Sequence, residues 1–374
     1  MKDLLNHLAE HFNIYPNEII FEKVLHGRRE KQNVHKIRVK NEIYLLKRHE
    51  VGRAATDAGY TPFKIETHTL SMLNKGGCNV PQIVWLSEQQ NTFLLSWCGD
   101  ETLDTIAQKK SDTNRISTGW ETQPIPTGLE TQPLRRILKE LCKIENFFAE
   151  NATHFRPYLF QHNLEQNLRR LLEQGRSTLG YLQHLSKTAP TNSKNLAQDT
   201  QLDAAWESIT GQLLDAKPTL GALDYQAHNI VIDNQQPYFI DFASIGWDWQ
   251  ERRLVQYFNS IGAYKEGANF ISLLNSELVE TYVEWVTQHR ENCSPTEIAA
   301  LVDSHHLLFY LSVIHRILEA VARPKRLDSK ILSEAWGNLQ SRFKHAISLI
   351  VEVKLSDDPF TNQIRQMIAE CQTE

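Results

Sequence analysis

The sequence predicts an α+β protein of two lobes, with a small N-terminal antiparallel sheet that carries one helix and a larger C-terminal lobe that is mostly helical. Three observations lead to this prediction. Strand-like apolar runs lie before residue 98, helix-like apolar spacing dominates after residue 134, and the 374 residues are enough for two cores. We therefore assign residues 1–98 to the N-lobe and residues 99–374 to the C-lobe.

The elements of the N-lobe follow from the spacing of apolar residues. Four of them predict an opening helix: Leu4, Leu5, Leu8 and Phe12. Strand-like runs predict five strands: 19–25, 34–39, 42–49, 80–88 and 91–97. The first three strands form a predicted antiparallel meander. Residues 63–75 have helical spacing, and Gly76-Gly77 then ends that helix.

The C-lobe is predicted to be helical except for one hairpin at residues 221–246. Helical patterns occupy six segments: 134–150, 163–184, 202–214, 268–289, 297–322 and 328–352. Residues 111–133 differ in character, because they contain the tandem repeat TGWETQP and TGLETQP in a polar stretch without helical or strand period. This composition predicts a flexible insertion.

Charge and cysteine content argue against several classes of protein. The net charge of -5 and the pI of about 6.3 argue against a general binder of nucleic acid or of membrane surfaces. The five cysteines are scattered without a CxxC pair, which argues against a disulfide framework or a zinc site. No stretch approaches the ~18 apolar residues needed to span a bilayer, and the N-terminus lacks the apolar core of a signal peptide. We expect a cytoplasmic protein with no nucleic-acid or membrane partner.

The hairpin segment LDYQAHNIVIDNQQPYFIDFASIG, residues 223–246, carries three oxygen-bearing side chains at its open end. If the hairpin is symmetric about Gln235, Asn229 lies opposite Asp241, and directly opposed residues have Cβ atoms roughly 5 Å apart. An amide oxygen and a carboxylate in this arrangement suit Mg²⁺, which takes one or two protein groups together with water and substrate phosphates. Asp224 lies five positions before Asn229, close enough to join the pair.

This pattern resembles the motif of the aminoglycoside phosphotransferase and choline kinase-like family, which has the protein-kinase-like fold. The motif is D-x4-N, a strand, a turn, a strand and an Asp-aromatic pair, and this chain has DYQAHN followed by IDF. The resemblance covers roughly residues 19–260. It implies that Asp224 is the catalytic base, that Asn229 and Asp241 are metal ligands, and that ATP and Mg²⁺ are the cofactors. Phosphoryl transfer needs a carboxylate to orient the attacking hydroxyl and cations to offset the phosphate charge.

The first half of the chain extends the resemblance. YLLK resembles the strand lysine of the family, which implies that Lys47 reaches the nucleotide phosphates. Glu66 begins ETHTLSMLNKGGCNVP, which resembles the family's E-x3-L-x2-L helix followed by Val-Pro, and it would pair with Lys47. FLLSWCGDETLDTIA resembles a strand that leads into an interlobe hinge. Backbone groups near Ser96, Trp97 and Cys98 would then hydrogen-bond the adenine.

The chain departs from the family's pattern at three places. Relatives usually have His two positions before the catalytic Asp, and this chain has Ala222 there. The phosphate-facing turn HGRREKQN contains a single Gly, and its Arg28 and Arg29 either contact phosphates or are solvated. Relatives often carry an acidic residue near the start of the helix after IDF, where this chain has Arg252 and Arg253.

The favoured function is an ATP- and Mg²⁺-dependent kinase of a small hydroxylated metabolite or antibiotic. The alternative is a pseudokinase of the same fold that binds nucleotide or a partner protein without phosphoryl transfer, which Ala222 and the turn with one glycine favour. A third hypothesis is a nucleotide-dependent transferase that modifies a protein hydroxyl. The acceptor, the choice between ATP and GTP and the oligomeric state stay open. Trp247 and Trp249 either line the acceptor pocket or belong to the core.

Overall fold

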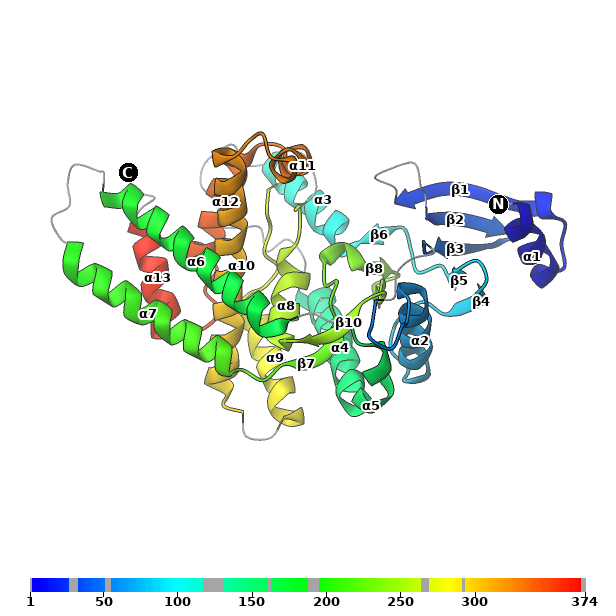
Figure 1. The fold of residues 1–374 in the computed structure, drawn as a ribbon, viewed down its shortest axis with the longest axis horizontal. Helices are drawn as coiled ribbons and strands as arrows, with labels where there is room; N and C mark the ends of the chain where they lie inside the picture. Colours follow the sequence, from blue (N-terminus) through cyan, green and yellow to red (C-terminus); the bar gives the residue numbers. More distant parts are fainter. Residues whose placement is uncertain are drawn as a thin grey trace.

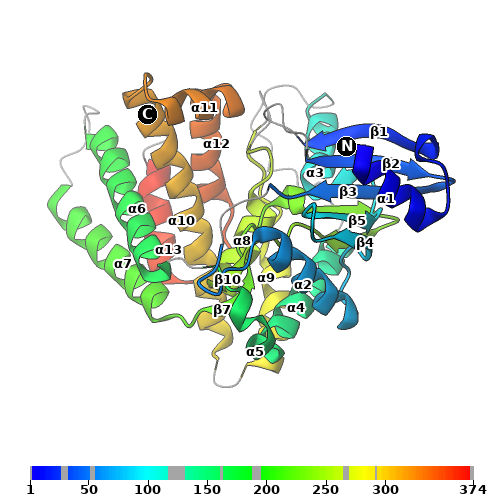
Figure 2. The same cartoon turned by 45° about the vertical axis from the view of Figure 1, so that its right-hand side comes forward.

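The computed structural model describes residues 2–26, 33–50, 55–116, 131–160, 163–187, 195–263, 269–290 and 293–370. Figure 1 shows a sheet at one end of the molecule, a group of long helices at the other end, and a hairpin between them. The same arrangement is visible after a 45° turn (Figure 2), where α2 lies between the sheet and α4. The α+β fold class predicted from the sequence is confirmed.

The N-lobe contains a five-stranded antiparallel sheet in the order β1-β2-β3-β5-β4. The strands are β1 (Ile19–His26), β2 (Val34–Val39), β3 (Glu42–Arg48), β4 (Ile83–Ser87) and β5 (Thr92–Ser96). The helices are α1 (Lys2–Phe12), the short η1 (Pro16–Glu18) and α2 (Pro62–Lys75). Thr61 caps α2, because its side-chain oxygen accepts from the backbone N–H of Lys64. These elements match the strands and helices predicted for this half of the chain.

The two faces of the N-lobe sheet have different neighbours. On one face a small core joins the sheet to α1; its buried members are Leu4, Leu8, Ala9, Ile19, Ile37, Val39, Tyr44, Leu46 and Leu94. Lys47 follows Leu46 in β3 and therefore lies on the opposite face, where its cross-strand partners are Val34 and Phe93. This second face looks toward α2 and the C-lobe, so the strand alternation places Lys47 between the lobes.

The C-lobe combines three short strand pairings with eleven α-helices among the described residues. Its first elements are β6 (Glu101–Thr102), α3 (Leu103–Ile116), α4 (Thr131–Glu150), α5 (Ala152–Phe155), η2 (Arg156–Tyr158), α6 (Leu164–Lys187) and α7 (Asn195–Asp215). The central elements are β7 (Thr219–Ala222), η3 (Ala227–Asn229), β8 (Ile230–Asp233), β9 (Gln236–Phe239), β10 (Ile245–Asp248) and α8 (Gln250–Asn259). The last are α9 (Ser276–His289), α10 (Pro295–Ala322), α11 (Leu327–Trp336), α12 (Leu339–Glu352) and α13 (Pro359–Glu370).

Two large cores hold the C-lobe together. The hairpin core joins α2 of the N-lobe to α4, the β8–β9 hairpin, α8 and α9; among its buried members are Phe63, Leu138, Ile230, Phe239, Tyr257 and Tyr282. The bundle core joins α6, α7, α10, α11, α12 and α13; among its buried members are Leu172, Trp206, Leu307, Tyr310, Trp336 and Ile364. Because α2 shares a core with the hairpin, the N-lobe helix and the hairpin are held in a fixed relation.

Three of the helices predicted for the C-lobe have wrong bounds. The predicted helix 202–214 begins earlier, since α7 already starts at Asn195. The predicted helix 268–289 begins only at Ser276, because Asn275 caps α9 with its side chain. The predicted helix 328–352 is two helices. Gly337 ends α11 with a positive φ of 64°, and this conformation, which residues other than glycine rarely adopt, turns the chain before α12.

The predicted insertion at 111–133 is shorter than its composition suggested. Residues 111–116 continue α3, and residues 131–133 begin α4, although the polar composition gave no helical period. Residues 117–130, which contain most of the tandem repeat, lie outside the described residues. Helix α13 was not predicted at all from the sequence.

The predicted register of the hairpin is also wrong, by one residue. Ile230 pairs with Phe239 and Asp233 pairs with Gln236, so the loop contains only two residues. These are Asn234 and Gln235, and both have positive φ, 47° and 65°. Two central residues with positive φ are the signature of a type I′ turn, whose twist matches that of the two strands. The sequence analysis instead placed a longer turn centred on Gln235.

One helix of the described chain, α10, has the length and composition of a segment that could cross a membrane. The sequence analysis had predicted no membrane-spanning segment. Two thirds (67%) of its most apolar window is buried inside the protein, where it packs against α6, α8 and α12. A mostly buried core helix meets the same criteria of length and hydropathy, and α10 is the central helix of the bundle core.

Candidate active site

The two lobes meet at a chain of charged side chains centred on Lys47. Lys47 Nζ lies 2.8 Å from Glu66 Oε1 of α2 and 2.7 Å from Asp241 Oδ1, which follows β9. Glu66 is 1% exposed and Lys47 is 14% exposed, whereas Asp241 is 37% exposed. The most buried carboxylate therefore fixes the lysine, and the more accessible one faces the cleft. These three residues, which come from β3, α2 and the end of the hairpin, are brought together as the sequence predicted for Lys47 and Glu66.

Electrostatics keeps Lys47 and Asp241 charged. Burial alone would lower the pKa of Lys47, but the carboxylates of Glu66 and Asp241 outweigh it and raise that pKa above its ordinary value. Burial likewise opposes ionisation of Asp241, yet Lys47 holds the pKa of this carboxyl below its usual 3.8. A permanently charged lysine beside an ionised aspartate is the arrangement that an anionic ligand with bound cations needs.

His49 is a further member of this charged chain. Its Nε2 lies 2.6 Å from Glu66 Oε2, so both oxygens of Glu66 are occupied, one by Lys47 and one by His49. The imidazole ring also lies against Phe93, at 5.7 Å, and Phe63, at 6.3 Å between ring centroids. Sequence reasoning missed His49, although it follows Lys47 by two positions. Residues two positions apart in a strand lie on the same face, and this spacing could have predicted that His49 lies beside Lys47.

Asp241 reaches Lys47 through an unusual backbone conformation. Its φ is 65°, in the left-handed region that costs energy for residues other than glycine. Aspartate tolerates this region better than most residues. The backbone N–H of the preceding Ile240 donates to the carbonyl of Asn229 at 2.9 Å, so pairing to the segment before β8 continues as far as Ile240. The chain then turns at Asp241, and the carboxylate of Asp241 points away from the strand pairing and toward Lys47.

The segment between β7 and β8 carries the other predicted site residues. Asn229 Nδ2 donates to the backbone carbonyl of Asp224 at 2.9 Å, and Asn229 is 2% exposed. Gln226 Nε2 donates to Asp224 Oδ1 at 3.0 Å. Asp224 is thus held through its backbone by one amide and through its carboxylate by another. Its second carboxylate oxygen makes no hydrogen bond with the described residues, which leaves that oxygen available to an incoming hydroxyl.

The shifted register changes how Asn229 and Asp241 are related. They are not directly opposite across the hairpin as predicted, since Ile240 takes the position across from Asn229. The amide nitrogen of Asn229 is used by Asp224, and its amide oxygen is the atom left for a ligand. Asp241 offers a carboxylate oxygen besides the one that contacts Lys47. The donor atoms are therefore oxygens, as the sequence analysis expected.

A cavity of about 440 Å³ lies at this position. Its walls are residues of β2, β3 and α2 together with Asp241: Asn33, Val34, Lys47, Arg48, His49, Glu50, Pro62 and Asp241. Lys47, Arg48 and His49 place several nitrogen donors on one wall, and Asp241 faces them from the C-lobe. Such a cavity suits a polyanion bound together with a cation. The predicted phosphate-facing turn adjoins this cavity in sequence, but Arg28 and Arg29 lie outside the described residues.

The predicted hinge lies at the end of β5. Ser96 forms the last ladder pair, with Tyr44, so Trp97 and Cys98 continue beyond the sheet. Lys36 of β2 lies 4.4 Å from the centre of the Trp97 ring and forms an ion pair of 2.8 Å with Asp100. On β2, Lys36 shares a face with Val34, which pairs with Lys47 across the strands. The hinge and the charged chain therefore border the same side of the sheet.

The oxygens of Asn229 and Asp241 fit the donor type that Mg²⁺ takes. Among the described residues no group of three or more His, Cys, Asp or Glu side chains is arranged to hold a metal ion. Mg²⁺ is typically bound by one or two protein oxygens and completed by water and substrate phosphates. Asn229 and Asp241 could supply this number of oxygens, next to the cavity that Lys47 lines.

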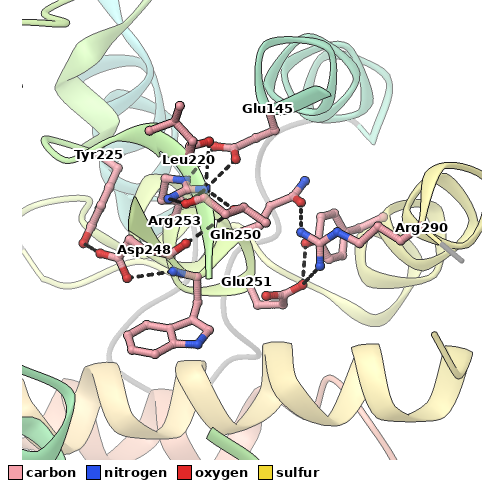
Figure 3. A network of polar contacts seen from close by, with 11 residues as sticks. Glu145, Leu220, Tyr225, Asp248, Gln250, Glu251, Arg253 and Arg290 are labelled. Atoms are coloured by element: carbon pink, nitrogen blue, oxygen red, sulfur yellow. Dashed lines mark hydrogen bonds and ion pairs between the residues drawn. The ribbon is translucent and has the colours of Figure 1, made fainter. Parts of the chain in front are cut away.

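The segment that carries Asp224 is braced from below by a buried polar network (Figure 3). The hydroxyl of Tyr225 donates to Asp248, which also accepts from the backbone N–H of Trp249 at 2.8 Å. Burial opposes ionisation of Asp248, but Arg252 and Arg253 keep its pKa below the usual 3.8. The position before the segment, Ala222, is buried and brings no polar group.

The sequence analysis left open whether Trp247 and Trp249 line the acceptor pocket or belong to the core, and the structure gives them different environments. Trp249 is buried in the bundle core, and its indole N–H donates to the carbonyl of Ala216 at 2.8 Å. Trp247 is 45% exposed. Trp249 is therefore a core residue.

The network below Asp224, which includes Glu145, Tyr225 and Asp248, was missed by sequence reasoning because no linear pattern connects its members.

Comparison with known proteins finds distant structural matches. No family model matches the chain, and no curated protein matches it in sequence. Solved structures with a similar fold include an aminoglycoside phosphotransferase from Alicyclobacillus acidocaldarius, with 11% identity, a TM-score of 0.46, and coverage of 88% of this chain and 92% of that one. A choline/ethanolamine kinase family protein from Mesorhizobium loti has 12% identity, a TM-score of 0.46, and coverage of 93% and 92%.

A third similar structure is the amicoumacin kinase hAmiN, solved in complex with AMP-PNP, Ca²⁺ and Ami. It has 11% identity, a TM-score of 0.47, and coverage of 96% of both chains. At identities of 11–12% and TM-scores below 0.5, these matches carry no argument about this chain. The roles of individual residues therefore have to come from the geometry of this chain.

Proposed function

We propose that this protein is an ATP- and Mg²⁺-dependent phosphotransferase that acts on a hydroxyl of a small molecule. The observation that carries the proposal is the bridge formed by Lys47, which contacts Glu66 at 2.8 Å and Asp241 at 2.7 Å. This bridge joins a strand, a helix and the end of a hairpin at the wall of a cavity of about 440 Å³. Phosphoryl transfer requires such a fixed cation beside a metal-binding carboxylate.

The contacts of Lys47 and Glu66 support a role for each of these residues. Lys47 would bind the phosphates of ATP, and Glu66 would hold Lys47 in place. Backbone groups near Ser96, Trp97 and Cys98 would bind the adenine. Bound Mg²⁺ would offset the charge on the β- and γ-phosphates. Figure 1 shows β3, the strand of Lys47, in the sheet at one end of the molecule and β8 of the hairpin toward its centre.

The remaining roles belong to the C-lobe. Asn229 and Asp241 would hold Mg²⁺ through their free oxygens. Asp224 would orient the acceptor hydroxyl and accept its proton through the carboxylate oxygen that Gln226 does not occupy. The acceptor is a small molecule in this proposal, and no nucleic acid or membrane takes part.

A second candidate is a pseudokinase that binds nucleotide without transferring phosphate. The observation in its favour is Ala222, which is buried on β7 and gives the segment before Asp224 no polar side chain. Both candidates need the nucleotide site, and only the first needs a productive Asp224. Turnover separates them.

The experiment combines calorimetry with a search for turnover. ATP should bind in the presence of Mg²⁺, and Lys47→Met should weaken this binding at least about tenfold, because a hydrogen bond to a charged group is lost. Lys64→Met is a matched control, since Lys64 is exposed on the same helix as Glu66. A library of hydroxylated metabolites would then be tested for ADP release. Absence of ATP affinity would remove both candidates, and tight binding without turnover on any acceptor would favour the pseudokinase.

A further inference from the structure

A buried ion pair lies directly beneath the strand that precedes Asp224 (Figure 3). Arg253 of α8 donates through Nε and Nη2 to the two oxygens of Glu145 on α4, each at 2.6 Å. Arg253 is 0% exposed and Glu145 is 4% exposed. This bidentate geometry fixes the orientation of the guanidinium group as well as its position.

The same guanidinium group holds strand β7. It donates to the backbone carbonyl of Thr219 at 3.4 Å, approaches that of Leu220 at 3.5 Å, and donates to the hydroxyl of Thr219. At Gly221 the strand passes so close that a Cβ atom would lie 2.7 Å from Arg253 Cζ. Glycine at this position lets the backbone lie against the guanidinium. Arg253 therefore couples α4 and α8 to β7.

Two more contacts, from residues that flank α8, hold the segment after β7. Asp248, just before α8, accepts from the hydroxyl of Tyr225. Ser260, just after α8, accepts from the backbone N–H of Ala227 at 2.7 Å. With Arg253, these contacts hold the chain on both sides of Asp224. The position of Asp224 is thus set from α8, although no residue of α8 contacts Asp224 in the described hydrogen bonds.

Stability alone is a weak reason for burying Glu145 and Arg253. The cost of removing two charges from water largely cancels their attraction, and apolar replacements of buried pairs are often neutral or stabilising. The contacts to β7 supply another reason, because an apolar residue at position 253 would leave the carbonyls of Thr219 and Leu220 without these donors. Ala222 offers no side chain that could take over this task.

We propose that Arg253, oriented by Glu145, is a positioning residue for the phosphoryl transfer: it holds β7 so that Asp224 meets the acceptor hydroxyl in the productive geometry. The inference rests on the proposed function, since it assigns Asp224 its task. Its physical basis is that misplacement of a reacting group by about 1 Å costs up to roughly 100-fold in rate. Arg253 acts through Asp224 and touches neither nucleotide nor acceptor in this proposal.

The test compares Arg253→Lys with Arg365→Lys. Arg365 is a matched control, because it also forms a buried pair with a carboxylate, Asp303, but in the bundle core. Lysine keeps the charge and loses the bidentate fork. Arg253→Lys should lower kcat by at least about tenfold and change the KM for ATP by less than about threefold. Arg365→Lys should leave both constants within about twofold, even if it lowers the melting temperature as much.

Two further measurements keep the proposal testable if Arg253→Lys folds poorly or if no acceptor is found. Gly221→Ala should push the guanidinium off β7 and lower kcat in the same way. Hydrogen exchange of peptides that span residues 219–230 should accelerate in both variants and not in Arg365→Lys, and this readout needs no turnover. Exchange that is unchanged in residues 219–230 would overturn the positioning role. A kcat for Arg253→Lys equal to that of Arg365→Lys would also overturn it, whereas lack of turnover in the wild type would overturn only the proposed function.

Discussion

Among the described residues, the hairpin core and the bundle core each contain an arginine–carboxylate pair in which both partners are buried, but the two pairs serve different surroundings. Arg253 and Glu145 lie beneath the segment of Asp224, and their guanidinium group reaches the backbone of β7. Arg365 and Asp303 link α13 to α10, and Arg365 also donates to the carbonyl of a third helix, α12. The same chemistry therefore holds a strand in one core and links helices in the other.

The two cores also differ in where the backbone adopts the left-handed conformation. In the helical bundle the position is Gly337, where glycine bears no penalty. Near the hairpin the positions include Gly99, which lies against Ile232 and Asp233, but also Asn234, Gln235 and Asp241, which carry side chains. Conformational strain is thus present beside the candidate site and avoided in the bundle. Such strain is common where function fixes a side chain in place.

The largest effect is expected at Asp224, the centre of the hairpin region. Asp224→Asn keeps the size of the side chain and its contact with Gln226 but removes the charge and the basicity. General-base contributions are typically ~10²–10⁴ in rate, so kcat should fall at least about 100-fold while nucleotide affinity changes less than about threefold. Steady-state kinetics and nucleotide titration measure both quantities.

Asp241→Asn is the matched variant for this comparison. It removes a proposed metal-ligating carboxylate that also contacts Lys47 at 2.7 Å. Both Mg²⁺–ATP affinity and turnover should therefore fall. Full activity of Asp224→Asn would show that Asp224 is not the base. Equal losses of nucleotide affinity in the two variants would contradict the separation of their roles.

The next largest effect concerns stability in the bundle. Asp303→Ala leaves the guanidinium of Arg365 buried without its carboxylate, and it also removes the acceptor of Ser356 and Thr361. Loss of one partner from a buried ion pair costs about 3–5 kcal/mol. Urea unfolding should show this loss, while kcat per folded molecule stays at the wild-type value. A parallel fall in kcat would mean that the bundle pair also positions the site.

The pH dependence of stability gives an independent check on Asp303. Burial opposes its ionisation, but Arg365 lowers its pKa below the usual 3.8 in the folded protein. A carboxyl with a lowered pKa stabilises the fold above its unfolded pKa and loses that contribution as the pH falls through the folded pKa. The stability difference between wild type and Asp303→Asn should therefore shrink as the pH falls from about 5 to below the lowered pKa.

The sequence was a good guide to local elements and to residues with a motif. The strands around Lys47 and the helix of Glu66 were predicted within a few residues, because alternation and helical spacing are local properties. The contact between Lys47 and Glu66 followed from the resemblance. The break at Gly337 had a local signal as well, since Gly followed by Asn often ends a helix, but the apolar period continued across it.

The remainder depended on information that is not local. The hairpin register required Asn234-Gln235 to form a two-residue turn, and without glycine this pair gives only a weak turn signal. Glu145 and Arg253 are separated by 108 positions, so no spacing rule could join them. Such pairs are chosen by packing of whole helices, which the apolar pattern does not encode.

A smaller effect is expected at His49, which tests whether the charged chain extends beyond Lys47. His49→Phe keeps the ring against Phe63 and Phe93 but leaves Glu66 Oε2 without its partner. Hydrogen bonds to charged groups are worth ~1.5–3 kcal/mol, so affinity for Mg²⁺–ATP should fall about tenfold. His49→Gln retains a donor and should recover part of the loss. Calorimetry with unchanged affinity in His49→Phe would confine the nucleotide site to Lys47.

The smallest effect is expected in the turn of the hairpin. Gln235 has a φ of 65° and an exposed contact with Arg136 at 3.0 Å. Gln235→Gly relieves left-handed strain of roughly 1–2 kcal/mol and adds an entropic cost of roughly 0.5–1 kcal/mol in the unfolded chain. The free energy of unfolding should therefore rise by about 0.5–1 kcal/mol, as the preference of type I′ turns for Asn-Gly also indicates.

Gly337→Ala is the matched variant in the bundle and should have the opposite sign. Its φ of 64° and ψ of -118° suit glycine and cost other residues of order 1–3 kcal/mol. Turnover should stay unchanged in both variants, because neither position touches the proposed site. If Gln235→Gly destabilises the protein, or if it lowers kcat, the strain in the turn helps to hold Asp241 toward Lys47. In that case the hairpin region would use all of its left-handed positions for function, rather than Asp241 alone.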